Sequence, residues 1–202
     1  MAEPKKEVAI TPATQIFHYM KARTGQIKLS LPPGMDADRF VHIAVSAIMR
    51  NPALANCTPA SFYSAVQWLA QMGLEPGGPD QLAYLVPYAD QCTPQVGYRG
   101  MIQIALEGGT KSIDAVIVCE NDEFEQIEGT TPSLIHKLPR LGKPRGEMIG
   151  VYARATLPSG EKISVVMDKD EIAKHRAKSL AAKSDRPGIN MWKEFPESAW
   201  KK

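Results

Sequence analysis

The spacing of apolar residues changes about halfway along this 202-residue chain, and that change limits the fold class. Before about residue 73, apolar residues recur every three to four positions, as at Phe62, Val66 and Leu69, which is the period of a helix face. Beyond residue 110 they are mostly Ile and Val in short runs, which is typical of strands. We therefore predict an α+β fold with a small antiparallel sheet, about three strands plus a β-hairpin, packed with helices.

Capping and turn residues indicate where the elements begin and end. Asp36 or Asp38 can cap a helix that stops before Pro52, and Thr58 followed by Pro59 can start another. The remaining predicted elements are a hairpin over 82–97, a helix over 100–106, a strand over 112–119, a strand pair over 148–157 and 162–167, and a basic helix starting at 168–171. Residues 129–146 contain three prolines and are expected to form a long connection.

Prolines and a glycine at 31–34 mark a break, so we predict a flexible N-terminal segment over 1–37 and one domain over 38–202. No apolar run approaches the roughly 20 residues of a membrane span, and no signal segment is recognised. The three cysteines lie far apart, which argues against a zinc site and suits a reducing cytoplasm. We expect a cytoplasmic protein without a membrane partner.

The net charge of +2 hides an asymmetry between the two parts of the chain. Residues 1–136 carry a net charge of −5, and residues 137–202 carry +7. A C-terminal third this basic is what a polyanion-binding face needs. A merely solvated surface, or a face that meets the acidic part of a neighbouring copy, would give the same pattern.

Gly97-Tyr98-Arg99-Gly100 lies at the predicted junction between hairpin and helix. Tyrosine can stack on an unpaired base, and arginine can neutralise its phosphate. The glycines would let a ligand approach the backbone, and helix N–H groups could donate to phosphate oxygens. An ordinary turn explains the same residues.

No nucleotide-binding loop of the GxxxxGK[ST] kind is present, so no ATP-driven motor is predicted. Asp168, Asp170 and Glu120 are the candidates for a metal-dependent nuclease, although helix capping explains the first two. A structural oligomerisation module is a third alternative.

Several separated motifs resemble the RecT/Redβ family of phage-type single-strand annealing proteins. The motifs are Asn51 to Leu54 (NPAL), Cys57 to Ser61 (CTPAS), Gly73 to Pro76 (GLEP), Tyr84 to Tyr88 (YLVPY), Gln95 with Gly97 to Ile102 (GYRGMI), Glu120 to Phe124 (ENDEF) and Trp192. They occur in the family's order over residues 40 to 200. Several motifs in the right order indicate the family far more specifically than any one of them.

The resemblance implies an ATP-independent protein that binds single-stranded DNA, anneals it to its complement and assembles into rings or helical filaments. It implies no cofactor, with Mg²⁺ as a modulator at most. The implied partners are single-stranded DNA, the annealed duplex intermediate, a 5′-to-3′ exonuclease and a single-strand-binding protein, in a bacterial or phage setting. With the charge pattern, it implies a DNA-binding set of Gln95, Tyr98, Arg99, Lys111, Lys137, Arg140, Lys143, Arg145, Arg154, Lys174, Lys178, Lys183 and Lys193.

The family pattern also places a further basic helix after the tryptophan, whereas this sequence stops at Lys202. On that comparison we expect residues 38–202 to form the DNA-binding, annealing and oligomerisation domain, truncated before the last basic helix.

Overall fold

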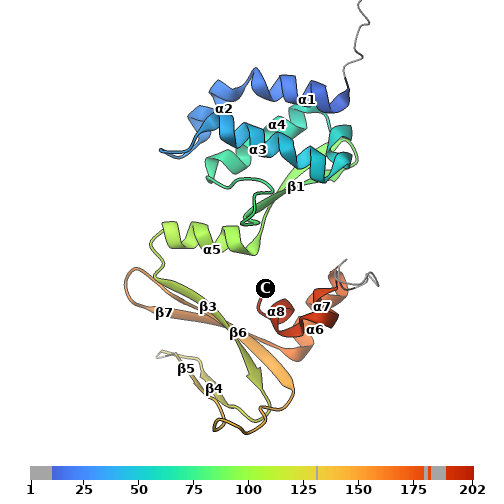
Figure 1. The fold of residues 1–202 in the computed structure, drawn as a ribbon. Coiled ribbons are helices and arrows are strands. Elements are labelled where there is room, and N and C mark those ends of the chain that lie inside the picture. The colour runs from blue at the N-terminus through green and yellow to red at the C-terminus, as the bar shows by residue number, and fades with distance from the viewer. Residues whose placement is uncertain (1–10, 131, 180–181, 183–189) are drawn as a thin grey trace, which may run out of the picture. The chain divides into compact units, whose positions relative to one another are not determined.

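A computed structural model describes residues 11–130, 132–179, 182 and 190–202 (Figure 1). Contacts divide the chain into two compact units, Met1–Ala105 and Leu106–Lys202. The domain predicted over 38–202 includes most of the first unit and all of the second, and each unit has its own hydrophobic core. The mixture of helices with small antiparallel sheets confirms the predicted α+β class.

The first unit consists of helices followed by a two-stranded hairpin and the start of another helix. Its elements are α1 (Pro12–Lys21), α2 (Thr24–Ser30), α3 (Ala37–Arg50), the 3₁₀ helix η1 (Pro52–Asn56), α4 (Pro59–Gln71), β1 (Ala83–Tyr88), β2 (Gln91–Val96) and α5 (Tyr98–Glu107). The predicted caps are confirmed: Asp36 accepts the Arg39 N–H at 2.6 Å, and Thr58 accepts the Ser61 N–H at 3.2 Å.

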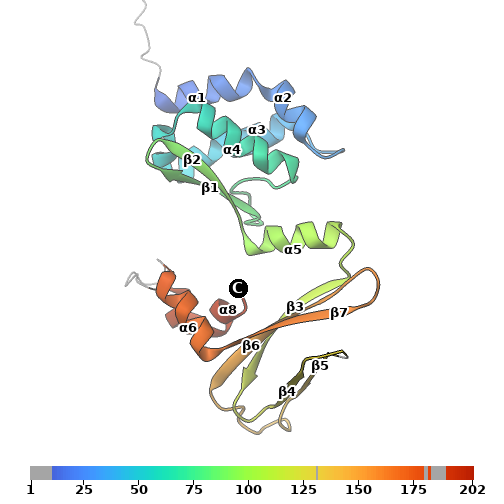
Figure 2. The ribbon, with the colours of Figure 1, turned by 180° about the vertical axis from the view of Figure 1, so that it is seen from behind.

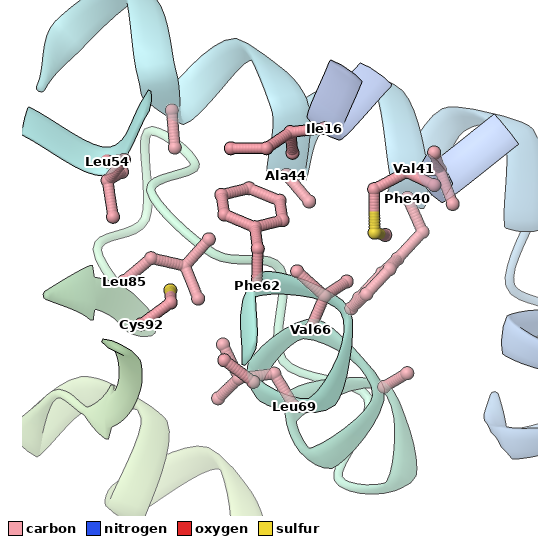
Figure 3. Close-up of a cluster of buried hydrophobic side chains, with 14 of the residues drawn as sticks. Ile16, Phe40, Val41, Ala44, Leu54, Phe62, Val66, Leu69, Leu85 and Cys92 are labelled. Carbon is pink, nitrogen blue, oxygen red and sulfur yellow. The ribbon is translucent and has the colours of Figure 1, made fainter. Parts of the chain in front are cut away.

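The core of the first unit lies among these helices and the inner face of the hairpin (Figure 3). Phe40 of α3 and Phe62 of α4 are completely buried, and Leu85 and Cys92 of the hairpin pack into the same cluster. Removing this apolar surface from water is the main force that holds the hairpin on the helices.

The prolines led us to predict a flexible segment over 1–37. Residues 11–31 instead form two helices, α1 and α2. Thr11 caps α1 and Pro12 occupies its first turn, where a missing N–H costs nothing. Ile16, Met20 and Ile27 are buried in the core, so α1 and α2 are integral parts of the unit.

Hydrogen bonds from the backbone and from the Ser61 hydroxyl anchor the hairpin to the start of α4. The Thr58 N–H donates to the Asp90 carbonyl at 2.8 Å. The Ser61 hydroxyl accepts the Cys92 N–H at 3.1 Å and donates to the Thr58 carbonyl at 3.0 Å. Between the strands, Ala89 adopts a left-handed φ of 53°, which lets the chain reverse within two residues. The hairpin is therefore held at both its tip and its inner face.

The two glycines at the start of α5 serve internal packing rather than ligand approach. A Cβ at Gly97 would lie 2.6 Å from the Gln81 carbonyl oxygen, and one at Gly100 would overlap the Leu82 carbonyl oxygen. The Gly97 N–H also donates to the Leu82 carbonyl at 2.8 Å. Only residues without a side chain allow this close approach of two backbone segments.

The second unit contains a three-stranded antiparallel sheet, a second hairpin and short helices (Figure 2). Its elements are β3 (Ser112–Cys119), β4 (Glu123–Ile127), β5 (Ser133–Lys137), β6 (Met148–Thr156), β7 (Lys162–Asp168), α6 (Lys169–Lys178), α7 (Met191–Glu194) and α8 (Pro196–Trp200). The order β3-β6-β7 confirms the predicted three strands, and the predicted capping box at Asp168 and Glu171 begins α6.

The expected long connection over 129–146 is wrong in part, since it contains β5. This strand pairs with β4 in the register Glu123↔Lys137 to Ile127↔Ser133. Proline spacing did not reveal β5 because its two flanks, rather than the strand itself, carry the prolines. In the small core of this unit, Ile117, Val151 and Ile172 are buried, with Trp192 and Trp200 packed against them.

Replacing Gly100 by alanine should lower the free energy of unfolding by about 1–3 kcal/mol, because the new methyl group overlaps a carbonyl oxygen that cannot move freely. Chemical unfolding followed by circular dichroism measures this change. Gly25→Ala is the matched control: Gly25 lies in α2 with no atom near its Cβ position, and should be neutral or slightly stabilising. Equal effects of the two substitutions would contradict the packing role of Gly100.

Candidate nucleic-acid interface

The candidate residues of the first unit lie together at the start of α5 and on β2. Tyr98 is 37% exposed, and its hydroxyl oxygen accepts a hydrogen bond from the Arg99 Nε at 3.1 Å. The Arg99 guanidinium is exposed and lies 5.9 Å from the Tyr98 ring centroid. Gln95 is exposed on β2, and its side-chain amide donates to the Tyr88 hydroxyl at 3.1 Å. These groups form one aromatic and cationic patch.

Sequence reasoning missed two aromatic residues of the same patch. Tyr84 and Tyr88 of β1 are 41% and 56% exposed. Tyr84 lies directly opposite Gln95, and Tyr88 lies opposite Gln91. The alternation in YLVPY, with Leu85 turned into the core, was the available signal, because alternate residues of a strand lie on opposite faces.

The basic candidates of the second unit are spread over several elements. Lys111 precedes β3, Lys137 ends β5, Arg140 and Lys143 lie in the connection to β6, Arg154 lies on β6, Lys174 and Lys178 lie on α6, and Lys193 lies on α7. All of these side chains are exposed. Lys183 lies outside the described residues.

Two of these side chains form exposed ion pairs. The Lys137 Nζ lies 2.7 Å from Glu123, and the Arg154 Nε lies 3.5 Å from Asp114. In each pair both side chains are more than half exposed, so water screens the attraction and either cation can exchange its partner at little cost.

Arg145 differs from the other candidates because it neutralises a buried carboxylate. Its Nε donates to Asp122 at 3.0 Å, and its Nη2 donates to Asp122 and to the Ile117 carbonyl. The Asp122 side chain is fully buried and also accepts the Cys119 N–H at 2.8 Å. The Arg145 guanidinium, followed by the Cys119 N–H and His136, holds the pKa of Asp122 well below its ordinary value, although burial acts in the opposite direction. Arg145 is thus a structural arginine.

An aromatic cluster extends this buried network. One imidazole nitrogen of His136 lies 3.1 Å from Asp122, and the other lies 3.2 Å from the Tyr152 hydroxyl. Phe124 packs against both rings. The network joins β4, β5 and β6, and so fixes the second hairpin on the sheet.

A groove of about 470 Å³ opens between the end of the β4–β5 hairpin and the β6–β7 strand pair. Its lining includes two cations, Arg154 and Lys162, and two carboxylates, Glu128 and Glu161. Lys162 was not among the residues selected from the sequence. It is directly opposite Thr156 on the neighbouring strand, two positions from Arg154.

Two of the three acidic candidates for a nuclease centre, Asp168 and Glu120, have structural partners. Asp168 accepts the N–H groups of Asp170 and Glu171 as the cap of α6. Glu120 accepts the Glu147 N–H at 3.2 Å. Within the described part of the chain, no three His, Cys, Asp or Glu side chains are grouped as metal ligands.

The architecture is that of an α+β protein with exposed aromatic groups in one unit and exposed cations in the other. The RecT family model matches residues 38–202, and the chain belongs to the RecT family. It is 36% identical over 180 residues to Protein RecT of Escherichia coli K12, covering 84% of this chain. It is 28% identical over 160 residues to the uncharacterized protein YqaK of Bacillus subtilis 168, covering 79% of this chain.

The chain spans 65% of the length of the Escherichia coli relative and 55% of the Bacillus subtilis relative. Among the described helices, none has the length and apolar content needed to cross a membrane.

Asp122→Asn should lower the free energy of unfolding at pH 7 by about 3 kcal/mol, because it removes the charge that Arg145 and His136 surround. The folded-state pKa of Asp122 is lowered, so its stabilisation is complete above the unfolded-state pKa of about 4 and is lost as the pH falls further. The difference between wild type and variant should therefore shrink below about pH 4. Denaturant unfolding across pH 2.5–7 checks this.

Asp114→Asn is the matched control, because it breaks the exposed pair with Arg154 and should change stability by less than about 0.5 kcal/mol. A stability difference for Asp122→Asn that stays constant down to pH 2.5 would contradict the ion-pair interpretation.

Proposed function

We propose that this chain binds single-stranded DNA and anneals it to a complementary strand in homologous recombination, without ATP. One strand would lie extended along a basic surface, with its bases available for pairing. The observation that carries the proposal is the match of the RecT family model to residues 38–202, which includes most of the first unit and all of the second.

The charges of the second unit support the proposal. Lys111, Arg140, Lys143, Lys174 and Lys178 are exposed, and within the described residues none of them forms an ion pair. Such cations can neutralise phosphates and release their counterions, which is the main source of sequence-independent affinity. Little preference for base sequence follows from this mode of binding.

We further propose that the protein is cytoplasmic, needs no cofactor and acts as a homo-oligomer, as a ring or a helical filament. A 5′-to-3′ exonuclease and a single-strand-binding protein are its proposed partners. The unequal charges of residues 1–136 and 137–202 suit head-to-tail contacts, which build rings or open helices.

The decisive experiment mixes the protein with two dye-labelled complementary oligonucleotides and follows pairing by energy transfer, without ATP and with Mg²⁺ present. Faster pairing with both strands intact on a denaturing gel supports the proposal. Cleaved strands would indicate a nuclease instead. Absence of any salt-dependent DNA binding would favour a purely structural module.

Lys174→Gln with Lys178→Gln should weaken DNA binding and reduce the slope of log K against log salt by about 1.4, which is two phosphate contacts at about 0.7 each. These lysines lie one helical turn apart on α6, so they can reach the same strand. Titration by fluorescence anisotropy at several salt concentrations measures the slope.

The control is Lys21→Gln with Lys28→Gln, which removes the same charge from exposed positions of α1 and α2. If both double variants change the slope equally, the effect comes from net charge and not from a contact at α6.

Self-association should appear in sedimentation velocity when complementary oligonucleotides are added in turn, and should weaken as salt screens the opposite charges. A protein that stays strictly monomeric without and with the oligonucleotides, at micromolar concentration and low salt, would exclude an annealing array.

A further inference from the structure

The outer face of the β1–β2 hairpin carries exposed tyrosine and glutamine side chains on either side of a half-buried valine and threonine. Residues directly opposite each other in an antiparallel pair lie on the same face. The outer face therefore carries the pairs Tyr84 with Gln95, Val86 with Thr93, and Tyr88 with Gln91. We call these six residues the tyrosine face.

The tyrosine face continues into the start of α5. The Tyr84 ring lies against Gly97, since a Cβ there would be 3.2 Å from the Tyr84 Cε2. Tyr98 and the exposed Arg99 follow Gly97 directly in the chain. One guanidinium therefore lies two residues from the glycine that Tyr84 contacts.

The tyrosine face is rigid before any ligand arrives. Leu85 and Cys92, on the inner side of the same strands, are buried in the core. Asp90 at the hairpin tip is bonded to Thr58, and the Gln95 amide holds the Tyr88 hydroxyl at 3.1 Å. Aromatic groups that are already fixed lose little entropy when a ligand binds.

The chemistry of the tyrosine face suits bases better than phosphates. Between residues 82 and 100 the only charged side chains are Asp90 and Arg99, so this segment carries no net charge. Tyr84 and Tyr88 are four residues apart, which is about 13 Å along a strand. The smaller Val86 and Thr93 lie between them in the register, and Tyr84 and Tyr88 are 41% and 56% exposed. In a duplex the base faces are already stacked, whereas unpaired bases are free to stack on an aromatic ring.

We propose that Tyr84 and Tyr88 stack on unpaired bases of a bound single strand. This inference rests on the proposed function and adds the part of the site that recognises the unpaired state. The ligand of the tyrosine face is thus the nucleobase and not the DNA backbone.

The test compares two 20-nucleotide probes, oligothymidylate and an abasic strand with the same deoxyribose-phosphate backbone. The wild-type protein should bind the first more tightly. Tyr84→Ala with Tyr88→Ala should lose about tenfold or more in affinity for oligothymidylate, from the usual stacking contribution of one base or more. Its affinity for the abasic strand should stay within about twofold, because phosphate contacts alone hold that probe.

Two further variants separate stacking from other effects. Tyr84→Phe with Tyr88→Phe keeps both rings and should retain the preference for oligothymidylate. Phe17→Ala removes a comparably exposed ring (39%) from α1 and should leave both affinities unchanged. Circular dichroism and thermal melting of each variant establish that it is folded.

The outcomes distinguish this inference from the proposed function. If wild type binds neither probe, both are overturned. If wild type binds both probes equally, or the double alanine variant keeps its preference, only the role of the tyrosine face is overturned. An alanine variant with normal DNA binding but altered sedimentation would make the tyrosine face a protein interface and would likewise overturn the inference.

Discussion

The second unit depends on the buried carboxylate of Asp122. An unpaired charge in that position would be very costly, so the fold must bring donors to it. Arg145, His136 and the Cys119 N–H come from three different segments, and all of them reach the same carboxylate. The segment between residues 123 and 144 is thereby tied back to β3, and the β4–β5 hairpin has one position on the sheet.

In the first unit the β1–β2 hairpin is held in place by backbone contacts and not by a buried charge. It is held by Asp90 at the tip and by the close approach of Gly97 and Gly100 to residues 81 and 82. In both units a hairpin is fixed by groups on its inner side, which leaves the outer side chains available to a ligand. Fixed scaffolds with exposed functional groups are what a binding surface needs.

The motifs that resemble the RecT family are mainly structural in this chain. Thr58 and Ser61 of CTPAS cap α4 and hold β2, and Leu74 of GLEP is completely buried. Asn121 of ENDEF binds the Pro144 carbonyl, beside the Asp122 network. These motif residues shape the fold, whereas Tyr84 and Tyr88 belong to a motif with one face in the core and one face outside.

The sequence by itself determined the fold class, the family and the boundaries of several elements, among them α3, α4 and β3, because caps, turns and hydrophobic period are local properties of the chain. Asp36 and Thr58 cap their helices, and Asp168 begins a capping box, as their sequence context predicts. Tertiary structure alone decided which charged side chains are available. Arg145 and Lys143 are both basic residues of the connection to β6. Arg145 binds the buried carboxylate of Asp122, whereas Lys143 is exposed. That difference depends on Asp122, which lies more than 20 residues away in the chain. Local sequence patterns do not reveal contacts between such distant segments.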